Sequence, residues 1–145
     1  PVPIDPRKFR DFRGGDIRVS LAGLASNLIL VVVFTLLVVV FVKLQGALSV
    51  GESTFGFLIR TARFGVFINL ILAFFNLIPI PPLDGSHVMY HFLPRPWRAA
   101  YQRAGQYGLL VLMGLVFFYP PFFNAILWPV NVLMGLADSF VELWI

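Results

Sequence analysis

Long apolar runs, interrupted by short polar or proline-containing segments, dominate the pattern along this chain. A helix needs about 20 apolar residues to cross a bilayer. The pattern therefore predicts membrane-spanning helices over residues 19–42, 58–78 and 108–118, and a last apolar helix over residues 122–145 that carries a proline. The few polar side chains inside these runs can bond to their own helix or to a neighbouring one.

The segments between the runs differ in character. Residues 1–18 are rich in charge and are expected to form a loop on the cytoplasmic side, and residues 44–57, with their glycines and small polar residues, predict a connecting loop. Residues 79–107 begin with a proline-rich loop and continue with the aromatic and arginine side chains of interfacial helices. We predict a single membrane domain over residues 1–145.

Composition agrees with this interpretation. Of the 145 residues, 59% are hydrophobic and only 12% are charged, which is far from the usage of a soluble domain. The predicted fold class is an all-α integral membrane protein, a polytopic bundle of about three to four transmembrane helices with a proline-broken segment. The chain has no cysteine, so any metal must bind through nitrogen or oxygen.

The distribution of basic residues indicates how the chain is oriented in the membrane, and it does not indicate a nucleic-acid partner. The net charge is +4, but the basic residues lie in short clusters beside apolar runs, so we expect membrane lipid and no nucleic acid around the chain. If the first two spans form a hairpin, the loop between them holds three basic residues and the opposite side holds eight: Arg7, Lys8, Arg10, Arg13, Arg18, Arg95, Arg98 and Arg103. This predicts a multi-pass protein of a bacterial inner membrane, with the N-terminus and Asp84 toward the cytoplasm.

Asp84 is the strongest candidate for chemistry. It follows an apolar run and three prolines, at a place where a carboxylate is costly unless it has a partner. One interpretation is that Asp84 caps a short helix beginning at Gly85. The other is that it is a metal ligand or a catalytic group, and the residues alone leave both open.

The other polar candidates carry weaker signals. His87 and His91 share a helix face, but the glutamate of a His-Glu-x-x-His zinc helix is missing, so we expect polar residues near the interface, with metal binding as the alternative. For Asn69 we expect an interhelical hydrogen bond. Asn76, at the predicted helix end, could offer its amide to exposed backbone or to an oxyanion.

Several of these residues resemble the signatures of one family. The run Asn76-x-x-Pro79-x-Pro81-x-x-Asp84-Gly85 is similar to the second signature of the site-2 proteases, intramembrane zinc metalloproteases of peptidase family M50. Residues 22–27, with Gly23 and Asn27, resemble their Gly-x-x-x-Asn element, although Leu24 stands where many members have proline. Residues 1–10 look like the preceding loop of compact bacterial members without a PDZ domain, and the resemblance continues to residue 112.

The resemblance implies a role for each matching residue. Asp84 would be the third ligand of a Zn²⁺ ion, and Asn76 and Asn27 would support the active-site geometry or the substrate. The other two ligands and the catalytic glutamate would come from an upstream His-Glu-x-x-His helix, which is absent from this sequence. Because the chain opens with Pro1 and has no signal peptide, we expect a fragment or a processed piece.

Three functions from different classes follow as hypotheses. The first is the C-terminal part of a protease that cleaves transmembrane protein substrates, inactive without its missing N-terminal helices. The second is a protease-derived subunit that has lost catalysis and serves as a scaffold in a larger membrane complex. The third is an ion-binding transporter fragment, in which proline-broken helices and a midplane carboxylate bind the ion.

Overall fold

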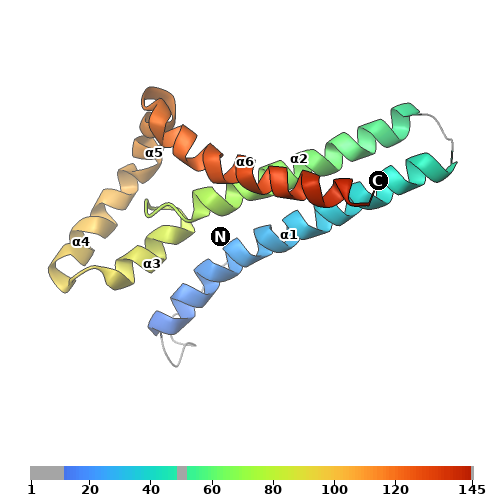
Figure 1. Ribbon diagram of the computed structural model, residues 1–145. Helices are drawn as coiled ribbons and strands as arrows, with labels where there is room; N and C mark the ends of the chain where they lie inside the picture. Colours follow the sequence, from blue (N-terminus) through green and yellow to red (C-terminus); the bar gives the residue numbers. More distant parts are fainter. Residues whose placement is uncertain (1–11, 49–51, 145) are drawn as a thin grey trace.

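The computed structural model describes residues 12–48 and 52–144; all regular secondary structure in these residues is helical, and the longest segment between helices is the series of turns over residues 77–83. The elements are the helices α1 (Phe12–Leu48), α2 (Glu52–Asn76), α3 (Asp84–Phe92) and α4 (Arg95–Ala104), the 3₁₀ turn η2 (Gly105–Tyr107), and the helices α5 (Gly108–Phe118) and α6 (Pro120–Glu142). Figure 1 shows α1 and α2 as a long antiparallel hairpin, with α3, α4 and α5 gathered at one end and α6 running back along it.

Three helices are long and apolar enough to cross a membrane: Ile17–Leu48 within α1, Thr54–Asn76 within α2, and α6. The all-helical, polytopic fold predicted from the sequence is therefore confirmed, with three such helices in the described residues. At 11 residues, α5 is about 16 Å long, roughly half of what the hydrocarbon core requires. The prediction of a span over residues 108–118 was wrong, because Tyr119 and the prolines after it turn the chain into α6 before α5 can cross.

The predicted loop over residues 44–57 is also corrected. Helix α1 continues to Leu48 and α2 already begins at Glu52, which leaves only residues 49–51 outside the described part. Glycine and small polar residues break helices in water, but in an apolar solvent no water competes for the backbone groups. Likewise, residues 12–18 of the predicted N-terminal loop belong to α1, whereas residues 1–11 lie outside the described part.

Polar side chains within the spans bond to their own helix. Ser26 Oγ donates to the carbonyl of Ala22 and Thr35 Oγ1 to that of Val31, both at 2.8 Å. Asn69 Nδ2 donates to the carbonyl of Gly65 at 2.8 Å. The interhelical bond expected for Asn69 was therefore wrong: its amide reaches one turn back along α2.

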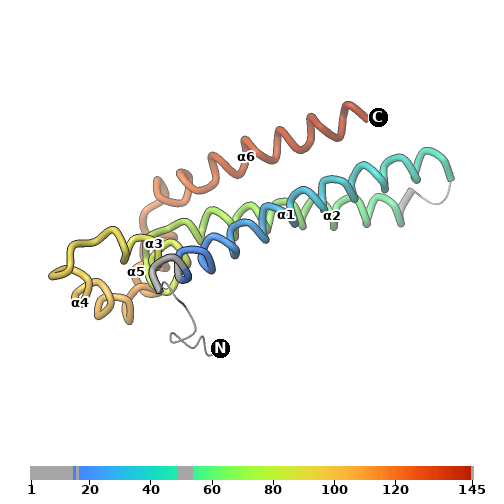
Figure 2. Tube along the Cα trace, turned by 90° about the horizontal axis from the view of Figure 1, so that it is seen from below, coloured from blue at the N-terminus to red at the C-terminus, as the bar shows by residue number. Residues whose placement is uncertain are grey.

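Helix α2 lies at the centre of the three candidate spans, with 33% of its most apolar window buried against 11% for α1 and 17% for α6. Two small buried clusters attach α6 to the hairpin, one of Val38, Ala62 and Val141 and one of Val66, Leu70 and Val130. An ion pair between Arg63 Nη2 and Asp138 Oδ1 at 3.2 Å joins α2 to α6. Figure 2 shows α6 on one side of the hairpin, running from the end where α3 and α5 lie toward the opposite end.

The second of these clusters predicts that the stability of the fold depends on Leu70 of α2. Leu70 is fully buried, so Leu70→Ala should leave a cavity and destabilise the protein by about 1–3 kcal/mol, since lipid already solvates leucine and mainly packing is lost. Leu72→Ala is the matched control, because Leu72 is 45% exposed on the same helix. Thermal unfolding in detergent measures both variants, and an equal loss in the two would contradict the packing described.

Candidate functional site

The proline-rich loop begins where α2 ends at Asn76. Pro79, Pro81 and Pro82 have no backbone N–H and cannot continue a helix. The chain instead turns through short backbone bonds, from Ile80 N to the Ile78 carbonyl at 2.8 Å and from Leu83 N to the Ile80 carbonyl at 3.0 Å. The loop is therefore a defined series of turns that leads directly into α3.

Asp84 is the first residue of α3, and the N-cap is Leu83, whose backbone is extended. The prediction that Asp84 caps a helix beginning at Gly85 was thus wrong by one position. In the first turn its carboxylate still lies near the positive end of the helix dipole. The carboxylate occupies a half-buried position there, at the end of the hairpin where α3 meets α1.

Gly23 of α1 lies against the Asp84 carboxylate, although the two residues are far apart in the sequence. A β-carbon on Gly23 would stand 2.7 Å from Asp84 Oδ2, closer than real β-carbons approach other atoms, so only glycine fits here without a shift. The structure thus brings together the two signature elements, one on α1 and one that runs from the end of α2 to the start of α3. No contact of this kind was deduced from the sequence.

Asn27 and Asn76 lie on different helices of this hairpin and are both half-buried. Asn27 follows Gly23 by one helical turn, and Asn76 closes α2 directly before the loop. Within the part of the chain that the structure describes, no hydrogen bond joins either amide to Asp84. Their expected supporting role rests on the resemblance alone.

The two histidines lie on α3, in different surroundings. His91 is buried, its ring is edge-on to Tyr90 with centroids 5.4 Å apart, and its carbonyl accepts from Arg98 Nη2 at 3.3 Å. His87 is exposed. Among residues 12–48 and 52–144, no group of three or more His, Cys, Asp or Glu side chains could hold a metal ion. Asp84, His87 and His91 thus do not form such a group within the described residues.

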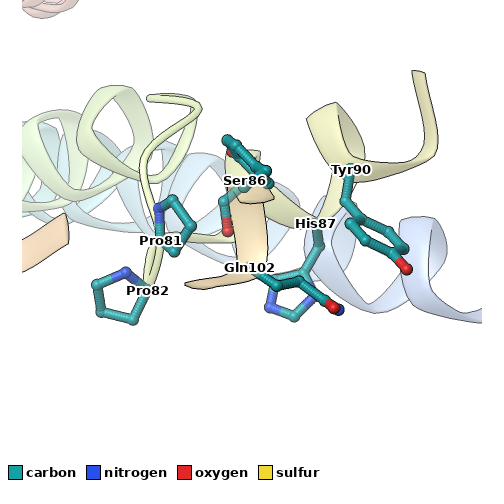
Figure 3. Close-up of a pocket in the computed structure, with 7 residues that line it drawn as sticks. Pro81, Pro82, Ser86, His87, Tyr90 and Gln102 are labelled. Carbon is teal, nitrogen blue, oxygen red and sulfur yellow. The ribbon is translucent and has the colours of Figure 1, made fainter. Parts of the chain in front are cut away.

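A pocket of about 550 Å³ opens beside the loop, between α3 and α4. In Figure 3, Pro81 and Pro82 lie on one side of this pocket, and His87, Tyr90 and Gln102 on the other. The remaining lining residues are Ser86 and Tyr101. Hydrogen-bonding groups and proline rings thus face the same hollow.

Tyr101 connects α4 to the loop. Its hydroxyl donates to the carbonyl of Pro79 at 2.8 Å. Burial raises the pKa of Tyr101, an effect that a hydrogen bond with Ser86 partly offsets, so the phenol stays protonated and able to donate at neutral pH. The sequence indicated Tyr101 only as an interfacial aromatic; its partner is 22 residues away, and no local spacing signals the bond.

The described residues do not form a zinc site by themselves. Catalytic zinc in proteins takes three protein ligands and keeps one open position. Asp84 is one carboxylate of suitable chemistry, half-buried at the end of two apolar helices, and no further donor set surrounds it in the described ranges. Any such site would need ligands from other residues.

Comparisons with known proteins bear on this arrangement. The family model described as "Peptidase family M50" matches residues 11–119. The Bacillus subtilis protein named "Putative zinc metalloprotease YwhC" is 36% identical over 150 residues, which cover 99% of this chain and 63% of that protein. The chain thus spans less than two thirds of this relative's length.

Two further relatives match over shorter stretches. The "Putative zinc metalloprotease MJ0611" of Methanocaldococcus jannaschii is 39% identical over 72 residues, which cover 50% of this chain and 32% of the relative. The "Metalloprotease MmpA" of Caulobacter vibrioides is 43% identical over 56 residues, which cover 35% of this chain and 14% of the relative. The search of solved structures found no match. Because the family model covers most of the chain and a relative aligns along nearly all of it, this multi-pass membrane protein belongs to peptidase family M50.

Proposed function

We propose that this chain is the C-terminal part of a site-2-type zinc metalloendopeptidase that hydrolyses peptide bonds of membrane-spanning substrates, and that Asp84 supplies one of three protein ligands to its Zn²⁺. The observation that carries the proposal is the placement of Asp84 against Gly23, which joins the two signature elements at one end of the hairpin. Family membership favours this proposal over an ion-binding transporter fragment.

Physical support for the proposal comes from the free-energy cost of an unpaired Asp84 carboxylate at this position. Asp84 is half-buried at the end of a candidate membrane span, where an unpaired charge is unfavourable. Within the described residues neither an ion pair nor a hydrogen bond of its side chain compensates for this. A divalent cation is a partner that offsets such a cost, and zinc accepts carboxylate oxygen together with histidine nitrogen.

The remaining ligands, two histidines, and the catalytic glutamate are proposed to lie on an upstream His-Glu-x-x-His helix. Support comes from the resemblance and from the greater length of the relative named YwhC. Zinc acts as a Lewis acid and activates water in enzymes of this kind. The contribution of this chain is to bind through Asp84 and to orient it, so the chain alone should not hydrolyse peptides.

The proposed setting is a bacterial inner membrane, with a transmembrane protein as substrate and, in some states, a larger membrane complex. Asp84 and the basic residues of α4 lie at the same end of the hairpin as the beginning of α1. The excess of Lys and Arg at that end supports a cytoplasmic location for it.

The ligand assignment predicts a selective loss of metal. In the full-length protein we expect about one zinc per chain, and Asp84→Asn should weaken zinc binding by roughly tenfold or more because one charged ligand is lost. Asp138→Asn is the matched control, because Asp138 is a carboxylate of α6 that pairs with Arg63 of α2. Metal analysis after dialysis against a chelator measures both, and stoichiometric zinc in Asp84→Asn would refute the assignment.

The two histidines of α3 give the complementary test. His87→Gln and His91→Gln should each retain one zinc per folded full-length chain, because the described residues place neither in a group that could bind metal. The same dialysis and metal analysis applies, with the amount of folded protein determined for each variant. Loss of zinc in either variant would show that α3 supplies a second ligand.

Orientation is testable by labelling, since this chain contains no cysteine. A membrane-impermeant thiol reagent should label Gly46→Cys, at the hairpin tip, in intact cells, but label Gln106→Cys only after permeabilisation. Both positions lie outside the buried core. The reverse pattern would place Asp84 on the external side.

A further inference from the structure

We propose that Tyr101, Gly105 and Gly108 are positioning residues that fix the loop of residues 79–82, and through it the direction in which Asp84 points. This inference rests on the proposed function, because the purpose of holding the loop is to hold a metal ligand. None of the three residues is proposed to touch metal or substrate.

Tyr101 supplies the hydrogen bond that the loop backbone needs. With prolines at positions 79, 81 and 82, the loop has few N–H groups of its own, so the Pro79 carbonyl finds its donor in the Tyr101 hydroxyl at 2.8 Å. The same phenol is hydrogen-bonded to Ser86, which is buried in the first turn of α3. One side chain of α4 therefore touches both the start of the loop and the helix that begins with Asp84.

The two glycines bring the following segment directly against Pro81. A β-carbon on Gly108 would overlap with the Pro81 carbonyl oxygen, and one on Gly105 would lie 2.9 Å from Pro81 Cβ. Backbone of η2 and α5 thus packs on the loop at a separation that a side chain would prevent. These contacts with η2 and α5 fix the position of the loop on that side.

Part of the loop borders an open pocket, which Tyr101 also lines. Pro81 and Pro82 face the pocket of about 550 Å³, as Figure 3 shows, and Pro82 is exposed. Beside this open space, the position of the loop depends on the hydrogen bond from Tyr101 and on the close contacts with Gly105 and Gly108. We therefore expect the loop to shift toward the pocket when the contacts with Tyr101 or Gly108 are changed.

A shift of the loop would reach Asp84 through the backbone. Leu83 N donates to the Ile80 carbonyl at 3.0 Å, and Ser86 N donates to the Leu83 carbonyl at 2.9 Å. These two bonds bracket Asp84, which follows Pro82 by two residues. Displacement of the loop thus changes the start of α3 and the direction of the carboxylate.

The first experiment compares zinc affinity in the full-length protein. Tyr101→Phe and Gly108→Ala should each bind zinc about tenfold more weakly than the wild type, as loss of a group that orients a ligand does elsewhere. Tyr107→Phe and Gly114→Ala are the matched controls: Tyr107 is exposed, and a β-carbon on Gly114 would meet no atom within 4 Å. Affinity is measured by competition with a chelator, and unchanged melting temperatures exclude a general loss of folding.

The second experiment reports on the loop without reference to zinc. Hydrogen exchange followed by mass spectrometry should show roughly fivefold faster exchange in the peptide over residues 76–86 for Tyr101→Phe, as expected for one lost hydrogen bond. The peptide over residues 62–72 of α2 serves as internal reference and should not change. If Gly108→Ala fails to fold, Tyr101→Phe alone still tests the proposal.

The outcomes separate the two proposals. If the wild type binds zinc through Asp84 but Tyr101→Phe and Gly108→Ala bind it equally well, the positioning role is refuted and the ligand assignment stands. If Asp84→Asn keeps its zinc while exchange in residues 76–86 still accelerates, the ligand assignment fails and the loop contact stands. Unchanged exchange in Tyr101→Phe refutes the positioning role in either case.

Discussion

Backbone groups released at the end of a membrane helix must find partners within the protein, and the arrangement around the candidate site depends on this constraint. Prolines at positions 79, 81 and 82 stop α2 and remove three donors at the place where the helix leaves unpaired carbonyls. Turn bonds from Leu77 and Ile78 use the carbonyls of Phe74 and Phe75. The fold then brings α4 back over the loop, so that Tyr101 meets the carbonyl of Pro79.

Much of the helical architecture could be predicted from the sequence. Apolar runs indicated α1, α2 and α6, and the prolines indicated the end of α2 to within two residues. Hydropathy alone did not predict which apolar segments are long enough to cross the membrane, or where a segment that contains glycine stays helical. The run over residues 108–118 is apolar but too short to cross, and the glycines near residue 46 allow helix in an apolar setting although they break it in water.

The candidate site was predictable in part, for a different reason. Asp84 stands out because a carboxylate after an apolar run needs an explanation, and that explanation came from the signature around it. Its contact with Gly23 and the bond between Tyr101 and Pro79 join residues distant in sequence. Such pairs depend on how helices pack, and a single sequence carries no periodic signal for them. The membership in peptidase family M50 agrees with the signature and leaves the missing ligands to other residues.

The contact between Gly23 and Asp84 also couples the site to the register of the hairpin. Neighbouring residues of an α-helix differ by about 1.5 Å along the axis and about 100° around it, so only a combined slide and turn of α1 would bring Ala22 or Leu24 to the place of Gly23. A β-carbon at that place would lie 2.7 Å from Asp84 Oδ2, so the carboxylate would have to turn away. The direction of the Asp84 carboxylate therefore depends on how α1 is aligned with α2 and α3.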